Sequence, residues 1–104
     1  MKGVLFVAGL VGLASGTMAA QHVLVSQQGK VFAPGEITIH EGDTVVVVND
    51  DRVLHHVYVE SPEFTFDSGE QQPGQSVRIT FTERGAFDAL CAIHPKMRLR
   101  VHVE

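Results

Sequence analysis

The feature that most restricts the fold of this chain is a series of short apolar runs without any long helical periodicity. After residue 20, runs rich in valine, isoleucine and phenylalanine are interrupted by glycine, proline, asparagine or aspartate. The interruptions recur about every eight to twelve residues, which is typical of a β-sandwich. We therefore expect an all-β Greek-key sandwich of about eight strands, over residues 22–27, 30–33, 36–40, 44–49, 55–60, 76–82, 86–91 and 97–103.

The longest polar interruption is the segment FDSGEQQPGQS, which starts at Phe66. Glycine, serine and proline favour irregular structure, and Pro73 followed by Gly74 favours a tight turn. We expect this segment to be a loop that crosses from one edge of the sandwich to the other.

The first twenty residues have the layout of a secretory signal peptide. A charged start is followed by the apolar run Val4–Ala14, which is too short to span a bilayer comfortably, and by small residues up to Ala20. We expect cleavage after Ala20 or one residue earlier, so that residues 1–20 are a signal peptide and residues 21–104 are one exported domain. The sequence thus predicts a periplasmic protein without stable membrane insertion.

Charge and cysteine content narrow the function further. The chain has 8 basic and 12 acidic residues and a formal net charge of −4, and the leader contains only one charged side chain, Lys2. An acidic chain of this kind gives no indication of nucleic-acid binding. Cys91 is the only cysteine, so no disulfide can form within the chain. An unpaired thiol in an oxidising compartment needs a partner, and a metal is the usual one.

Strand alternation places three side chains with metal-binding potential on the core face. These are Met97, Cys91 and His55, and each is in phase with apolar neighbours. The neighbours are Leu99, Val101 and Val103 for Met97, Phe87 and Ala89 for Cys91, and Val53, Val57 and Val59 for His55. His56 falls on the opposite face with Tyr58 and is expected to point away from the core.

The heptapeptide CAIHPKM contains a thiolate, an imidazole and a thioether, each three residues after the last. Structural zinc sites use four strong ligands and not a thioether. Two imidazoles and a thiolate with a weak axial methionine suit copper, as in blue-copper electron-transfer sites. Cys91, His94 and Met97 supply three of these groups, and the core-facing His55 is the best candidate for the fourth. Pro95 disfavours helical geometry at His94 and stiffens the loop.

The other polar residues have ordinary interpretations. Three histidines are expected to face solvent: His22, His40 and His102. The adjacent Asp50 and Asp51 are interpreted as turn residues and not as a calcium site, and Asp43 as part of a turn between strands. His56 is interpreted as an exposed side chain or as a hydrogen-bonding neighbour of the site.

Two segments carry a resemblance to a known family. FDALCAIHPKMRLRVHVE and FAPGEITIHEGDTVVVVNDDRVLHHV closely resemble the cupredoxins, or blue copper proteins, and within them the amicyanin and plastocyanin group. That group has the same Cys-x-x-His-x-x-Met spacing, a proline after the histidine, and an asparagine six residues before the first histidine ligand, as Asn49 is here. The resemblance covers essentially the whole chain after the leader. It implies a cupredoxin-like sandwich with one type 1 Cu(I)/Cu(II) ion, and its metal ligands would be His55, Cys91, His94 and Met97.

The chain departs from the family pattern near the site. His56 replaces a common asparagine that helps to tie the two ligand loops together, Leu54 replaces a frequent proline, and Lys96 replaces an apolar residue. The first change affects a bond next to the site, and the last adds a charge to the loop.

The resemblance and the donor set predict an exported electron carrier and not an enzyme. Its partners would be a redox protein donor and acceptor, such as a dehydrogenase and a c-type cytochrome, and it would act as a monomer. The alternative is a periplasmic protein for copper delivery or storage, although such proteins tend to have several methionines. A copper oxidase or reductase would need further histidines in His-x-His or His-Cys-His arrangements, which are absent from the sequence. A cysteine-nucleophile enzyme would need a partner to orient its base, and none is evident.

Overall fold

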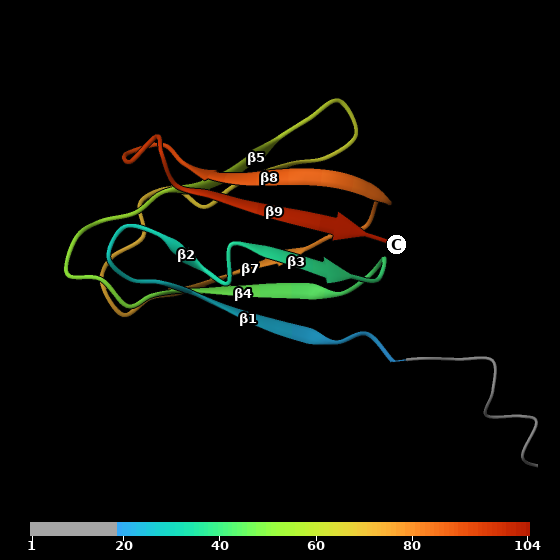
Figure 1. The fold of residues 1–104 in the computed structure, drawn as a ribbon, viewed down its shortest axis with the longest axis horizontal. Coiled ribbons are helices and arrows are strands. Elements are labelled where there is room, and N and C mark those ends of the chain that lie inside the picture. Colours follow the sequence, from blue (N-terminus) through green and yellow to red (C-terminus); the bar gives the residue numbers. More distant parts are fainter. Residues whose placement is uncertain (1–18) are drawn as a thin grey trace, which may run out of the picture.

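A computed structural model describes residues 19–104, so the expected signal peptide lies almost entirely outside the described residues. Nine strands occur in this part of the chain (Figure 1). They are β1 (His22–Gln27), β2 (Phe32–Ala33), β3 (Glu36–Ile39), β4 (Thr44–Asn49), β5 (Val57–Glu60), β6 (Thr65–Asp67), β7 (Ser76–Thr80), β8 (Gly85–Cys91) and β9 (Arg98–Val103). Within residues 19–104, no helix is long and apolar enough to cross a membrane.

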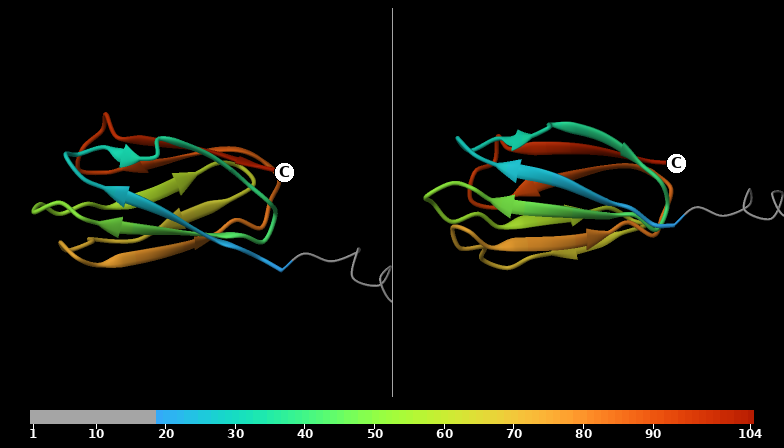
Figure 2. Two further views of the ribbon diagram at one scale, coloured as in Figure 1. Left: turned by 60° about the horizontal axis from the view of Figure 1, so that its bottom comes forward. Right: turned by 90° about the horizontal axis from the view of Figure 1, so that it is seen from below.

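The strands form two layers that face each other (Figures 1 and 2). One sheet has the order β2-β1-β4-β7 and the other the order β3-β9-β8-β5-β6. Most neighbouring strands are antiparallel, but β1 runs parallel to β4 and β3 runs parallel to β9. The prediction of an all-β sandwich is confirmed.

The core lies between the two sheets and is built from side chains that alternate along each strand. From Phe87 to the end of β8, and along β9, every second residue is buried, because only one face of each strand contacts the opposite sheet. The buried apolar residues are Val25, Phe32, Ile39, Val45, Val47, Val57, Val59, Ile79, Phe81, Phe87, Ala89, Cys91, Met97, Leu99, Val101 and Val103. The expected core orientation of Cys91 and Met97 is therefore confirmed.

Three aromatic rings pack together at the start of β8. The ring centroid of Phe64 lies 5.1 Å from that of Phe81 and 5.8 Å from that of Phe87, in tilted and edge-to-face arrangements. Phe87 precedes Cys91 by four strand residues, which corresponds to about 13 Å. The aromatic packing therefore supports the end of the sandwich that is remote from Cys91.

The strand predictions differ from the structure mainly at the second sheet's edge. β6 was not predicted, because Phe66 is its only apolar residue and three residues give no alternation to read. β5 begins at Val57 and not at residue 55. Val53, expected in phase with the core valines, lies in the preceding loop and is 39 % exposed.

The segment predicted as a loop, which starts at Phe66, overlaps β6 at Phe66 and Asp67, but from Ser68 to Gln75 it is the predicted connection between the sheets. It leads from the edge of one sheet to the edge of the other. The N–H of Gln75 donates to the carbonyl of Gln72 at 3.0 Å, which closes a turn around Pro73 and Gly74. Gly74 has a φ of 86°, a left-handed value that glycine adopts without steric cost.

Asp43 joins several chain segments at the end of the sandwich remote from Cys91. Its carboxylate accepts hydrogen bonds from the N–H groups of Gln21 at 2.8 Å and His40 at 2.9 Å, and its carbonyl accepts one from Phe81 at 3.0 Å. The side chain is 5 % exposed. The backbone hydrogen bonds from Gln21 and His40 lower the pKa of Asp43 below the ordinary value of 3.8.

This arrangement predicts a specific dependence of stability on pH. Because the pKa of Asp43 is lower in the folded than in the unfolded chain, its contribution to stability is complete above pH 3.8 and is lost as the pH falls through the folded-state pKa. We expect Asp43→Asn to lower the free energy of unfolding at neutral pH, and the difference from wild type to narrow in acid. Urea unfolding of the metal-free proteins across a pH series measures both effects. The exposed Glu83→Gln is the control, and a gap for Asp43→Asn that stays constant into acid would contradict the assignment.

Candidate metal centre

The candidate ligands meet at one end of the sandwich, where β8 ends and the segment before β5 passes beside it. Cys91 is the last residue of β8 and pairs with Val57, the first residue of β5. His55 is two residues before Val57 and therefore lies on the same face as Cys91. His55 and Cys91 are both buried, at 0 % and 2 % exposure. The structure thus brings together residues that are 36 positions apart in the chain.

Three donor atoms form a small triangle. The Sγ atom of Cys91 lies 3.6 Å from Nδ1 of His55 and 3.6 Å from Nδ1 of His94, and the two Nδ1 atoms are 3.3 Å apart. A point equidistant from the three atoms is about 2 Å from each, close to the metal–nitrogen and metal–sulfur bond lengths in proteins. A thiolate and two imidazole nitrogens are also the ligands that copper favours. The donor set therefore fits a copper ion in both size and chemistry.

Met97 is the fourth predicted site residue. It is 2 % exposed and directly precedes β9. Its N–H donates to the carbonyl of His94 at 3.0 Å, so that the residues from His94 to Met97 form a turn. Met97 is therefore buried immediately before the last strand and is joined to His94 by a backbone hydrogen bond.

The backbone around His55 is fixed by reciprocal hydrogen bonds. His55 N–H donates to the carbonyl of Gln71 at 3.0 Å, and Gln71 N–H donates back to the carbonyl of His55 at 2.7 Å. The buried Asn49 donates from Nδ2 to the carbonyls of Val53 at 2.9 Å and Gln71 at 3.1 Å. Asn49, the residue singled out by the family resemblance, thus holds the segment that carries His55.

A second network of buried amides is connected to Asn49 through Gln71. Gln27 donates from Nε2 to Oε1 of Gln71 at 2.7 Å, and Gln71 donates from Nε2 to the carbonyls of Val47 at 3.0 Å and Gln75 at 2.8 Å. Both glutamine side chains are buried, and of their polar side-chain atoms only Oε1 of Gln27 lacks a hydrogen-bond partner. Because unpaired buried amides are costly, this network favours a single arrangement of β1, β4 and the loop before β7.

Asp51 also contacts the site, which the sequence analysis did not predict. Its Oδ2 atom lies 2.8 Å from Nε2 of His55, and its carboxylate accepts hydrogen bonds from the N–H groups of Gly29 at 2.6 Å and Lys30 at 3.0 Å. Burial alone would raise the pKa of Asp51, but the hydrogen bonds from His55, Lys30 and Gly29 lower it overall. The one sequence signal was an aspartate four residues before the candidate ligand.

His94 is the more accessible of the two imidazoles. It is half-buried, and neighbouring Ile93 is 44 % exposed. Burial lowers the pKa of His94, and the nearby His55 and Lys30 lower it further. A lowered pKa keeps the ring neutral at neutral pH, which is the form that binds a metal.

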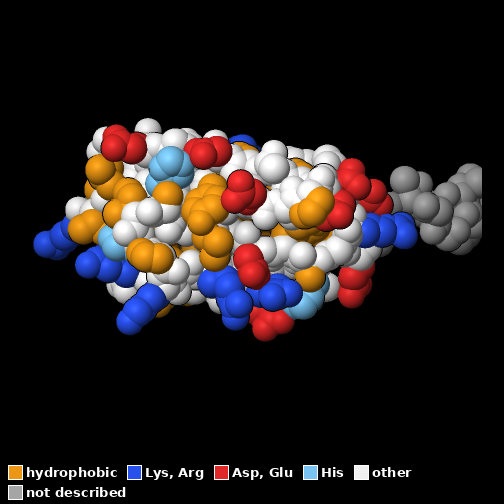
Figure 3. Space-filling model, turned by 90° about the horizontal axis from the view of Figure 1, so that it is seen from above, with side chains coloured by type: hydrophobic (Ala, Val, Ile, Leu, Met, Phe, Trp, Pro, Cys, Tyr) orange, Lys and Arg blue, Asp and Glu red, His pale blue; other side chains and the backbone are white. Residues whose placement is uncertain are grey.

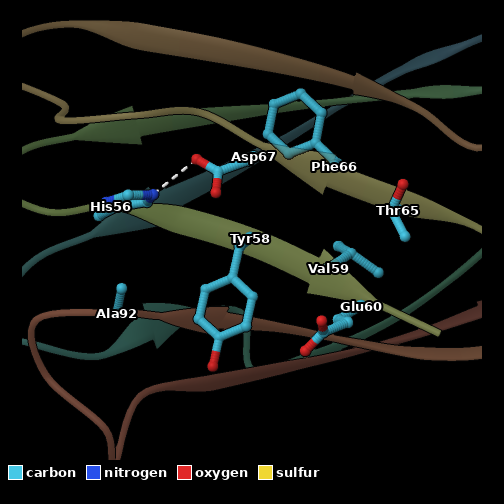
Figure 4. Close-up of a pocket in the computed structure, with 8 residues that line it drawn as sticks. All are labelled: His56, Tyr58, Val59, Glu60, Thr65, Phe66, Asp67 and Ala92. Carbon is cyan, nitrogen blue, oxygen red and sulfur yellow. Dashed lines mark hydrogen bonds and ion pairs between the residues drawn. The ribbon is translucent and has the colours of Figure 1, made fainter.

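His56 lies outside the donor cluster, as its strand phase predicted. Its Nε2 atom is 2.6 Å from Oδ1 of Asp67, and both side chains border a shallow groove on the outer side of β5 and β6 (Figure 4). The two ligand loops are joined by the backbone instead, because Ala92 N–H donates to the carbonyl of His56 at 2.9 Å. The replacement of the family's asparagine by His56 therefore leaves a direct link between the loops. The predictions for His22, His40 and His102 also hold, since the first two are exposed and the third is partly exposed.

The surface at this end combines apolar and basic side chains (Figure 3). Ile93, Val53 and Val31 are exposed hydrophobic residues. Two exposed cations, Lys96 and Arg52, flank the same loops. Arg98 is also exposed, but its guanidinium lies 3.9 Å from a carboxylate oxygen of Asp88.

Comparison with known proteins places these features in a family. The sequence profile of the copper-binding proteins of the plastocyanin/azurin family matches residues 19–104. Amicyanin of Paracoccus versutus is 33 % identical over 95 residues, which cover 88 % of this chain and 72 % of that protein. The methylamine utilization protein MauL of Methylophilus methylotrophus is 33 % identical over 75 residues, and this chain spans only 43 % of its length.

Solved structures agree with this comparison. The Cu(I) form of an amicyanin point mutant superimposes with a TM-score of 0.74 at 29 % identity, covering 84 % of this chain and 86 % of that one. A purple cupredoxin from Nitrosopumilus maritimus, at 22 % identity and a TM-score of 0.71, shares the fold.

The positions of the two adjacent histidines predict opposite outcomes for two matched variants. His55→Ala removes a buried donor of the triangle, so we expect loss of tight copper binding. His56→Ala removes only the bond to Asp67, so copper binding should persist. Copper titration followed by visible absorption, with urea unfolding to check that both variants fold, makes the comparison. Loss of copper binding by His56→Ala with retention by His55→Ala would show that the ligand assignment is reversed.

Proposed function

Since the chain belongs to the plastocyanin/azurin family of copper-binding proteins, we propose that it is an exported one-electron carrier whose single type 1 copper ion is bound by His55, Cys91, His94 and Met97. The observation that carries this proposal is the triangle of Cys91 Sγ and the two histidine Nδ1 atoms, with edges of 3.3 to 3.6 Å. Copper bound there supplies a reversible one-electron couple.

The chain holds the proposed ligands so that the site would change little between the copper(I) and copper(II) states. His55 is held through its backbone by Gln71, and Cys91 is in a strand that pairs on both sides. The loop from Cys91 to Met97 is anchored at Ala92 and contains Pro95, whose φ is restricted by its ring. Restricted motion of the ligands keeps the reorganisation on electron transfer small, which is what a carrier requires.

Electron exchange with a partner is proposed to occur beside His94. Its ring joins the buried donor cluster to the partly exposed surface around Ile93. Ile93 is an exposed apolar residue next to His94, and Val53 is exposed on the connection that carries His55. A small apolar contact suits short-lived encounters between redox proteins, whose interfaces are small.

The proposed partners are a dehydrogenase as donor and a c-type cytochrome as acceptor. Support comes from the relatives, since two are amicyanins and a third is named for methylamine utilization. A periplasmic location follows from the signal-peptide pattern of residues 1–20. Fractionation of the source cells and mass spectrometry of the mature N-terminus test both the location and cleavage after Ala20.

The thiolate of Cys91 predicts the colour of the protein. In the copper(II) form, charge donation from the thiolate should give intense blue absorption, and Cys91→Ser should abolish this band even where some copper still binds. Visible spectra at equal copper occupancy measure the effect. A colourless copper(II)-loaded wild type would contradict the carrier proposal and favour copper delivery or storage.

The basic residues near the site predict a salt-dependent encounter with an acidic partner. Surface charges steer association more than they increase affinity, and salt screens them over about 8 Å at physiological ionic strength. We expect electron transfer with the physiological partner to slow as salt rises, and Lys96→Glu to slow it severalfold at low salt without changing the copper spectrum. Stopped-flow rates across a salt series measure this.

Arg84→Glu is the matched control for Lys96→Glu. It changes the net charge equally, but Arg84 is exposed next to the start of β8, at the opposite end of that strand from Cys91. Rates that are insensitive to salt, or that respond equally to both variants, would reject local steering by Lys96.

A further inference from the structure

The two imidazoles of the metal centre differ in what holds their outer nitrogens. Nε2 of His55 lies 2.8 Å from a carboxylate oxygen of Asp51, in a position where the ring is fully buried and the carboxylate is 12 % exposed. Among residues 19–104, His94 has no comparable carboxylate partner. Both ring nitrogens of His55 thus have side-chain neighbours, Asp51 at Nε2 and the donor cluster at Nδ1. Within residues 19–104, the structure gives His94 such neighbours at Nδ1 only.

The carboxylate of Asp51 is itself fixed from several directions. It accepts hydrogen bonds from the backbone N–H groups of Gly29 and Lys30, which belong to the connection between β1 and β2. The Asp51 N–H donates to Oδ1 of Asn49 at 2.9 Å. Since these contacts fix both ends of the residue, Asp51 presents an oxygen to His55 from a rigid position.

The geometry determines which nitrogen of His55 carries the proton. An ionised carboxylate can only accept hydrogen bonds, so Nε2 of His55 must be the donor. A neutral imidazole with a proton on Nε2 has its lone pair on Nδ1. Nδ1 is the atom that faces Cys91 Sγ and His94 Nδ1 at 3.6 and 3.3 Å.

We infer that Asp51 is a positioning residue of the metal centre, which fixes the Nε2-protonated form of His55 and makes its Nδ1 a stronger donor to copper(II) than to copper(I). This inference rests on the proposed copper site. A carboxylate hydrogen-bonded to a ligating histidine fixes its tautomer and raises its basicity. The negative charge also favours the more highly charged copper(II) state, so that Asp51 lowers the reduction potential of the protein.

The size of the effect follows from known substitutions of this type. Loss of an outer partner of a ligating histidine typically weakens metal binding by about 10- to 100-fold. If Asp51→Asn weakens copper(II) binding about tenfold more than copper(I) binding, the reduction potential rises by about 59 mV.

The chain offers a matched control in the adjacent residue. Asp50→Asn removes the same charge one position away, but the Asp50 side chain accepts a hydrogen bond from Ser26 Oγ at 2.6 Å and does not contact His55. Asp51→Glu keeps the charge and an acceptor and serves as the conservative variant. We expect the reduction potential to rise in Asp51→Asn, to stay near wild type in Asp50→Asn, and to be lowered again in Asp51→Glu.

The second readout does not depend on copper redox chemistry. Nitrogen NMR shifts of His55 in the metal-free and copper(I) proteins report which ring nitrogen carries the proton. Wild type and Asp50→Asn should show the proton on Nε2, and Asp51→Asn should show a mixture in the metal-free state. A wild-type protein with the proton on Nδ1 in the metal-free form, or equal potentials in Asp51→Asn and Asp50→Asn, would overturn the inference.

These readouts separate this inference from the proposed function. Failure of the wild type to bind copper would reject the proposed function, while the metal-free NMR shifts would still test the role of Asp51. If Asp51→Asn fails to fold, the wild-type shifts and Asp51→Glu remain decisive, because a wild-type His55 proton on Nδ1 or a large potential rise in Asp51→Glu would each contradict the assigned role.

Discussion

The pairing register between β5 and β8 is the constraint on which the metal centre depends. Val57 lies opposite Cys91, and this register brings His55 beside the thiol. Strand side chains alternate between faces, so a slip of one residue would direct Cys91 outward and replace it with Leu90 on the core side. The same pairs that bury Val57 and Ala89 therefore set the distances between the metal-binding atoms. The same strand pairing therefore packs the core and positions the metal-binding atoms.

Much of this arrangement was predictable because it follows from local periodicity. Cys91, His94 and Met97 lie within seven consecutive residues, so their spacing can be read directly from the sequence. The phase of the last two strands predicted that Cys91 and Met97 face the core, where both are buried. His55 was distinguished from His56 by the same two-residue period. These properties need only the alternation of a strand and the presence of an apolar partner layer.

The parts that sequence reasoning missed depend on contacts between distant segments. β6 has too few apolar residues to produce a pattern and exists because it pairs with the edge of β5. Asp51 was interpreted as an ordinary turn residue, and its N–H does donate to Oδ1 of Asn49, two residues earlier in the chain. Its contact with the β1–β2 connection and with His55 depends on how the β1–β2 and β4–β5 connections meet at one end of the sandwich, which no local period encodes.

The distribution of polar groups explains how a small sandwich without a disulfide supports a rigid site. The aromatic cluster and Asp43 stabilise one end, while the buried amides of Gln27, Gln71 and Asn49 order the other. Polar networks of this kind favour one structure because most of their buried donors and acceptors are paired in it, although Oε1 of Gln27 has no partner. Metal binding adds to this, since a ligand that binds only the folded state stabilises it by about 4 kcal/mol at a thousand times its dissociation constant. Copper therefore stabilises the same loop geometry that its redox function requires, and the carboxylate of Asp51 links that geometry to the β1–β2 connection.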